Sequence, residues 1–222
     1  NAGASYLTIE QESLGALLSA DTQVTFTLGL SSNHKVAGGR LRGGVTMTRG
    51  AGLLGTTRLG DTGKSRFDGD GVFTKASAYL NWSGGVWGNL GFAMSGYGQI
   101  ADRPLLASQE ISIGGAYSAR GFDFSEIAGE NGVYGMAELN YTFRKPVPWI
   151  RQLQPYAFVD GGYADNMGTG SGSGSLLSAG MGLRAKIGGL SLEVEGAAPI
   201  NRARSTTGDK TPQVNVFLGL DI

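Results

Sequence analysis

Alternation of apolar and polar residues with a period of two recurs through almost the whole chain, while helical periodicity is nearly absent. A period of two places successive side chains on opposite faces of an extended strand. Together, the alternating stretches predict about eleven strands in hairpin order, and therefore an all-β, antiparallel meander. The longest of them lie at 24–30, 76–82, 133–143, 177–187 and 214–222.

Two environments produce such alternation. A soluble sheet turns its apolar face into a core, whereas a transmembrane barrel turns it towards lipid and keeps polar side chains around a lumen. Only 16% of the residues are charged, compared with about 25% in an average soluble domain. The polar faces hold glycines, hydroxyls and tyrosines rather than many Lys and Glu. The composition therefore favours a transmembrane β-barrel, with the lipid bilayer as a partner.

Several classes of function are not expected from the composition. The chain contains no cysteine and one histidine, and no nucleophile-elbow motif is present. The balance of 18 basic and 18 acidic residues gives no net field for nucleic acid. We therefore predict no enzyme activity, no catalytic residues, no metal site, no cofactor and no nucleic-acid partner.

Polar, glycine-rich connections separate the predicted strands, and two of them are long. The connection at 56–71 is polar, and the loop at 115–131 lies between two alternating stretches. Counting hairpins places the 115–131 loop on the same side of the barrel as the short turns. Outer-membrane barrels usually have short periplasmic turns and longer extracellular loops, so this count conflicts with the usual arrangement. Either the strand count is off by one, or this connection is unusual.

Four motifs follow one another from residue 109 onwards. A short strand ends at Gly114 and Gly115, and the tetrad Ala119-Arg120-Gly121-Phe122 comes next. A later strand carries Glu138, and the one after it carries Phe158-x-Asp160-x-Gly162. This ordered set resembles the two-partner secretion transporters of the haemolysin-activator type, whose superfamily also contains the barrel-assembly insertases. Ala119 departs from the family's usual Val or Ile.

The resemblance implies a barrel of roughly sixteen strands in which the loop with the tetrad folds back into the lumen. Residues 1–222 would then be the C-terminal part of this outer-membrane β-barrel domain, without the family's plug helix and periplasmic POTRA modules. The implied function is a translocation channel in the bacterial outer membrane. It would secrete and activate a partner protein of the haemolysin or adhesin type, which is bound in transit. The alternatives are an insertase of the same superfamily and a barrel that anchors a patatin-like secreted lipase.

The alternation adds a geometric prediction to this resemblance. It places Glu138, Phe158 and Asp160 on the lumen-facing side of neighbouring strands. We expect Arg120 to reach from the loop, to form a bidentate pair with Asp160 and to stack on Phe158. Our hypothesis is that this contact locks the loop, including Gly121 and Phe122, in a transport-competent position.

Simpler interpretations of the same residues remain open at this point. Arg120 would then be a solvated loop residue, and Asp160 would cap a turn. Glu138 is either a carboxylate of the lumen wall or a contact of the loop. Gly114, Gly115, Gly121 and Gly162 are bulge and close-approach glycines in either interpretation.

Overall fold

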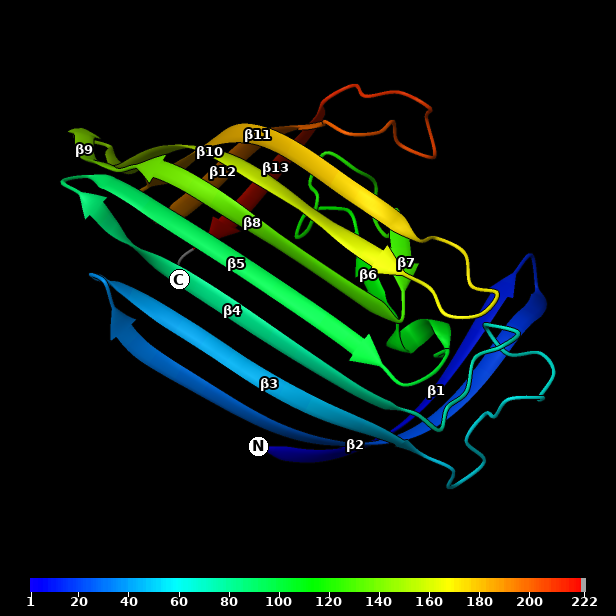
Figure 1. The fold of residues 1–222 in the computed structure, drawn as a ribbon. Coiled ribbons are helices and arrows are strands. Elements are labelled where there is room, and N and C mark those ends of the chain that lie inside the picture. Colours follow the sequence, from blue (N-terminus) through cyan, green and yellow to red (C-terminus); the bar gives the residue numbers. More distant parts are fainter. Residues whose placement is uncertain (221–222) are drawn as a thin grey trace.

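A computed structural model describes residues 1–220 of the chain. Eleven of its strands form one curved, antiparallel sheet in the order β1-β2-β3-β4-β5-β8-β10-β11-β12-β13, with β9 beside β10 (Figure 1). The all-β fold and the partial barrel predicted from the alternation are confirmed. Ile222, the end of the last predicted strand, lies outside the described residues.

The strands of the large sheet have the following bounds: β1 Ala2–Ser13, β2 Ala16–Val36, β3 Gly39–Ala51, β4 Thr74–Trp87, β5 Leu90–Ala101, β8 Asn131–Tyr141, β9 Phe143–Val147, β10 Ile150–Asp165, β11 Gly174–Ile187, β12 Leu190–Pro199 and β13 Gln213–Leu220. A short 3₁₀ helix, η1, spans Ala107–Gln109. Within residues 1–220, no helix is long and apolar enough to cross a membrane.

The convex face of the sheet is apolar. Residues directly opposite each other on neighbouring strands share a face, and the register runs from Leu30 through Val45 and Ala78 to Gly98 and Val133. Leu30, Val45 and Val133 are all exposed on this outer face. Exposed apolar side chains in rows along the strands suit contact with lipid hydrocarbon.

The connections at the two ends of the strands differ in length. At one end the chain turns within two residues, at 37–38, 88–89, 148–149 and 188–189. At the other end lie the long connections 52–73, 102–130, 166–173 and 200–212, together with one two-residue turn at 14–15. By the asymmetry of outer-membrane barrels, the long connections are extracellular.

The predicted position of the 115–131 loop, on the side of the short turns, is wrong. The hairpin count treated Ile111–Ile113 as a spanning strand, but these residues form β6, which pairs only with β7 (Ile127–Gly129) in a separate two-stranded sheet. Figure 1 shows β6 and β7 inside the curve of the large sheet. The loop therefore belongs to the side of the long connections, and the conflict with the usual barrel arrangement disappears.

The 52–73 connection is fixed to the upper edge of β2. β2 extends beyond the end of β3, so near Ala20 and Thr22 its backbone pairs with β1 on one side and has no neighbouring strand on the side of β3. The amide of Ala20 donates to the Gly63 carbonyl at 2.7 Å, and the amide of Thr57 donates to the Thr22 carbonyl at 2.8 Å. These bonds satisfy an edge that would otherwise stay open, and they hold the connection close to the barrel.

Candidate functional site

The segment from β6 to β7, residues 111–129, is here called the lumen loop, and an apolar cluster fixes it to the barrel wall. Phe122 is completely buried in this cluster, together with Ile113 and Ile127 of the loop. Ala164 of β10 and Leu176 of β11 complete it from the wall. Phe122 is thus an apolar anchor of the loop, and burial of a phenylalanine side chain contributes about 1.5–3 kcal/mol.

Two of the predicted glycines turn the chain at the end of β6. Gly114 and Gly115 have φ angles of +121° and +95°, which L side chains rarely adopt. A Cβ at Gly114 would also lie 2.3 Å from the carbonyl oxygen of Asp123. Glycine is therefore required at the first of these positions by both backbone angle and space.

The other two predicted glycines allow close approach between the loop and the wall. A Cβ at Gly121 would lie 2.6 Å from the carbonyl carbon of Ala198 and 2.7 Å from the nitrogen of Pro199. A Cβ at Gly162 would lie 2.9 Å from Cδ1 of Ile113. The backbone of the tetrad thus rests directly on β12, and Gly162 leaves room for the apolar part of the loop.

Arg120 reaches from the tip of the loop to three groups on the wall. Its Nε donates to Asp160 at 2.7 Å, and its Nη1 donates to Glu195 at 2.5 Å. The guanidinium carbon lies 3.3 Å from the centre of the Phe158 ring. The Arg120 side chain is 10% exposed, and the two carboxylates are 1% and 2% exposed. This is a buried ion pair with a cation–π contact beneath it.

The expected two-pronged pairing of the guanidinium with Asp160 is not found. Asp160 accepts one hydrogen bond from the guanidinium, donated by Nε. The backbone amide of Arg120 also donates to Asp160, at 3.3 Å. Ser178, directly opposite Asp160 on β11, donates its hydroxyl to Oδ1. Because that oxygen is already engaged and Glu195 lies nearby, the guanidinium divides between two carboxylates.

Glycines on β11 make room for the rings beneath the guanidinium groups. Gly180 lies opposite Phe158, and Gly182 lies opposite Tyr156. A Cβ at Gly180 would lie 2.5 Å from Cζ of Phe158, and one at Gly182 would lie 2.4 Å from Cζ of Tyr156. Each ring therefore extends over a glycine of the next strand, and its other face contacts a guanidinium group: that of Arg120 for Phe158 and that of Arg184, on β11, for Tyr156.

A second arginine, Arg184 of β11, repeats the arrangement one row further along the wall. It donates to both oxygens of Glu138, at 2.7 and 2.9 Å, and its Nε donates to Glu193 at 3.1 Å. Its guanidinium carbon lies 3.8 Å from the centre of the Tyr156 ring. Glu138 thus pairs with Arg184 of the wall and is a carboxylate of the lumen wall, which is the first of the two alternatives for this residue.

Tyr156 connects the two arginine groups. Its hydroxyl lies 2.6 Å from Oε1 of Glu193 and 2.8 Å from Oε2 of Glu195. Glu193 forms an ion pair with Arg184, and Glu195 forms one with Arg120. The Tyr156 hydroxyl therefore bridges the two ion pairs. Alternation places Arg184, Glu193 and Glu195 on the polar face, but nothing in the sequence distinguishes them from other polar residues there.

The outer part of the lumen loop is tied to the 200–212 connection. The backbone amide of Ser205 donates to Glu126 at 2.6 Å, and Gln213 donates to Asp123 at 2.7 Å. Thr206 donates its hydroxyl to the other oxygen of Asp123. The loop therefore contacts an extracellular connection as well as the wall.

Known proteins share the sequence and the fold of this chain. Residues 15–185 match the family described as haemolysin secretion/activation protein ShlB/FhaC/HecB. The outer membrane transporter CdiB of Dickeya dadantii (strain 3937) is 30% identical over 154 residues, which cover 68% of this chain and 27% of that protein. A protein of the same name from Escherichia coli is 30% identical over 139 residues, covering 63% and 23%. The chain thus spans about a quarter of the length of these relatives.

Solved structures agree with the sequence relatives. CdiB from Escherichia coli superposes with a TM-score of 0.80 at 26% identity, over 98% of this chain and 40% of that one. CdiB from Acinetobacter baumannii, at 21% identity, shares the fold with a TM-score of 0.70 over 90% of this chain and 34% of that one. The fold and these relatives place the chain in the bacterial outer membrane. The chain belongs to the haemolysin secretion/activation protein family, the two-partner secretion transporters that its motifs resemble.

Proposed function

We propose that residues 1–222 are part of the barrel domain of an outer-membrane channel, and that this channel secretes a partner protein of the haemolysin or adhesin type. The observation that carries the proposal is the contact of Arg120, on a loop inside the barrel, with Asp160, Glu195 and Phe158 on the lumen wall. A loop held in this way occupies the route that a polypeptide in transit would take.

The chemistry of the lumen face suits passage of an unfolded chain. Glycines, hydroxyls and tyrosines line it between the ion pairs of Arg120 and Arg184, so an extended polypeptide meets weak contacts at many sites. Transport then runs on folding of the exported partner outside the cell, and the channel itself has no catalytic role. The relatives found are named transporters, so the insertase and lipase-anchor alternatives gain no support.

In this proposal Arg120 and Asp160 hold the lumen loop in the position that transport requires. Removal of Arg120 leaves the buried carboxylates of Asp160 and Glu195 without their cation, at a cost of about 3–5 kcal/mol. Removal of Asp160 takes away the acceptor of both Nε and the backbone amide of Arg120 and leaves the guanidinium with Glu195 alone. We therefore expect Arg120→Ala and Asp160→Ala each to reduce secretion severely. Gly121 and Phe122 support the same position through backbone approach and apolar burial.

The test is a secretion assay with the full-length transporter and a large exported protein of the haemolysin or adhesin type from the same genome. Partner protein in the medium is quantified for the wild type, Arg120→Ala, Asp160→Ala and the control Arg103→Ala, whose side chain is 42% exposed. Heat-modifiability of the barrel confirms assembly of each variant. Secretion by the wild type and the control alone supports the proposal, whereas undiminished secretion in both Arg120→Ala and Asp160→Ala overturns the role of the contact.

A further inference from the structure

The lumen loop has a neck, formed by the residues directly before and after it. Glu110 precedes β6 and Glu130 follows β7, so these two carboxylates mark the points where the loop leaves and rejoins the barrel wall. Glu130 is completely buried, and the Glu110 side chain is 12% exposed. Two buried carboxylates on neighbouring segments need a cation to compensate their negative charges.

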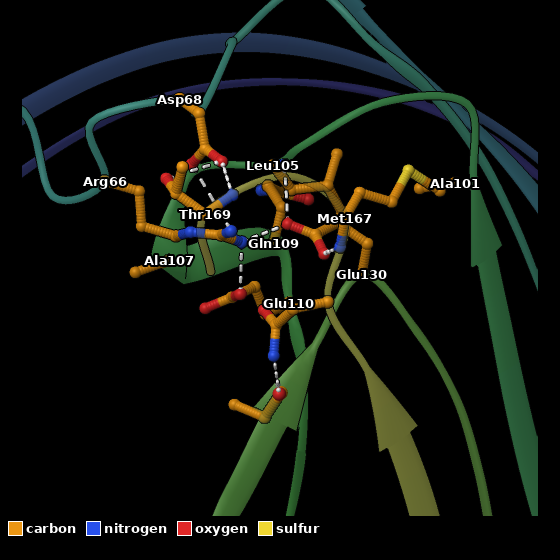
Figure 2. A network of polar contacts seen from close by, with 12 residues as sticks. Arg66, Asp68, Ala101, Leu105, Ala107, Gln109, Glu110, Glu130, Met167 and Thr169 are labelled. Carbon is orange, nitrogen blue, oxygen red and sulfur yellow. Dashed lines mark hydrogen bonds and ion pairs between the residues drawn. The ribbon is translucent and has the colours of Figure 1, made fainter. Parts of the chain in front are cut away.

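That partner is Arg66, from the 52–73 connection between β3 and β4. Its Nη1 donates to Oε1 of Glu110 and to Oε1 of Glu130, and its Nη2 lies 3.4 Å from Asp68 (Figure 2). The side chain is 10% exposed. One guanidinium from a different connection therefore bridges the two sides of the neck.

The same cluster reaches a third connection. The backbone amide of Met167 donates to Oε2 of Glu130 at 2.7 Å. Thr169 donates its amide to Asp68 at 2.7 Å and its hydroxyl at 3.0 Å (Figure 2). Three long connections, 52–73, 102–130 and 166–173, thus meet at Arg66 and its carboxylates.

Wall strands hold the neck from the opposite side by bonds that do not involve Arg66. Gln99 of β5 donates to the carbonyls of Gln109 and Glu130, at 2.9 and 3.1 Å. Lys75 of β4 donates to the Gln109 carbonyl at 2.8 Å. The backbone of the neck is therefore seated on the wall, and Arg66 connects its two carboxylates to the 52–73 connection.

We propose that Arg66 is a positioning residue that closes the neck of the lumen loop, so that the loop and the extracellular 52–73 connection move as one unit. The consequence for secretion rests on the function proposed above, but the geometric statement is independent of it. Arginine suits this position better than lysine because its planar fork reaches several carboxylates at once. Without it, three carboxylates would face one another with no cation between them.

Spin-label distances in the full-length protein test whether the two segments move together. The chain contains no cysteine, so introduced cysteines at Leu59 and Tyr117 are the labelling sites within it. Both positions are exposed, at 64% and 93%, one on the 52–73 connection and the other on the lumen loop. Distance distributions between the labels are recorded for the wild type and for Arg66→Gln, Arg66→Lys and Arg58→Gln.

The control Arg58→Gln removes an arginine of the same connection whose guanidinium bonds to the Gly52 carbonyl. We expect one narrow distribution in the wild type and in Arg58→Gln. We expect the distance distribution to be broad in Arg66→Gln. In Arg66→Lys we expect it to be narrower than in Arg66→Gln and broader than in the wild type. If Arg66→Gln does not assemble, the comparison of Arg66→Lys with Arg58→Gln decides the matter.

A narrow distribution in both Arg66 variants, or equal broadening in Arg58→Gln, would overturn the proposal. A parallel secretion assay separates this result from the proposed function. A wild type that secretes no partner contradicts the function and leaves the distances to decide the role of Arg66. A secreting wild type whose distances do not depend on Arg66 contradicts only the neck proposal.

Discussion

The tip and the neck of the lumen loop are each held by one guanidinium, but the partners of the two guanidiniums lie on different kinds of structure. At the tip, the partners of Arg120 are Asp160 and Glu195, on spanning strands whose register is fixed by ladders on both sides. At the neck, the partners of Arg66 are on connections. The site of Asp160 and Glu195 lies on paired strands, so we expect it to keep its geometry when the loop moves away. The Arg66 cluster lies on connections, so we expect it to be lost when any one of these connections moves away.

This difference assigns different tasks to the two ends. The wall site at the tip is a preformed receptor to which the loop returns, since Ser178 and Tyr156 hold the two carboxylates whether or not Arg120 is present. The ion cluster of Arg66 with Glu110, Glu130 and Asp68 at the neck is assembled only when the 52–73 and 102–130 connections come together. Substitutions at each end should therefore have different effects on the lumen loop.

The largest effect is expected from Arg120→Gln, which leaves Asp160 and Glu195 buried without a cation. We expect the tip to lose about 3–5 kcal/mol of anchoring and the lumen loop to become cleavable by protease added outside the cell. In Arg120→Gln/Asp160→Asn, cleavage should decrease again, because one unpaired charge has been removed. Cleavage rates within residues 111–129 measure this, and a double variant more sensitive than the single one would contradict it.

Gly121→Ala should give a smaller effect of the same kind while the ion pair keeps its chemical groups. The added Cβ would meet the backbone of Ala198 and Pro199 and force the tetrad away from β12, at about 1–3 kcal/mol. Gly196→Ala on the same strand is the matched control, because a Cβ there meets open space. Equal protease sensitivity of the two variants would show that close backbone approach does not hold the tip.

Arg184→Gln should have a weaker effect on the tip, because Arg184 pairs with wall carboxylates and is connected to Glu195 only through the Tyr156 hydroxyl. We expect about 1 kcal/mol less anchoring of the tip, transmitted through Tyr156 to Glu195. A double-mutant cycle of Arg184→Gln with Arg120→Gln measures this coupling in the protease assay. Strictly additive effects would mean that the two ion pairs are independent, despite the shared hydroxyl.

The smallest effect is a pH dependence confined to the neck. Burial raises the pKa of Glu110 to about 7 from its ordinary 4.5; Arg66 opposes this shift, while Glu130 and Asp68 add to it. A carboxyl whose pKa is raised in the closed state stabilises that state most below pH 4.5, and this stability is lost as pH rises through about 7.

The neck should therefore be closed more tightly at pH 5 than at pH 8. Besides Arg66, Glu130 and Asp68, the ammonium of Lys75 lies nearby on the adjacent Gln109 carbonyl and contributes a positive charge to the same region. Amide exchange around residues 110–113 across this pH range measures the effect, and Glu110→Gln should remove the slope. A slope of the same size in Glu110→Gln would exclude Glu110 as its source.

Much of the fold and of the tip site was predictable from the sequence. Alternation alone placed Phe158 and Asp160 on the lumen face, and the ordered motifs identified Arg120 as the residue facing them. The hairpin count failed because Ile111–Ile113 alternates like a spanning strand, and three residues contain no information about the sheet to which they belong. Glu195 and Arg184 were not singled out, because their pairing depends on register across several strands.

The neck was not predictable. Arg66 lies in a polar connection without periodicity, and its partners are separated from it by 44 and 64 residues. No local pattern brings Glu110 and Glu130 together, since their proximity follows from the lumen loop returning to the wall. Tertiary contacts between connections create this site, whereas secondary structure creates the one at the tip.

The lumen loop is held at two ends by separate guanidinium contacts, that of Arg120 at the tip and that of Arg66 at the neck. Amide hydrogen exchange of the full-length protein, compared among the wild type, Arg120→Gln and Arg66→Gln, distinguishes the two contacts. We expect Arg120→Gln to lose protection first at residues 119–122, and Arg66→Gln to lose it at residues 110–113 and 127–131. Identical loss along all of residues 111–129 in both variants would contradict it, because the loop would then be one unit with a single anchor.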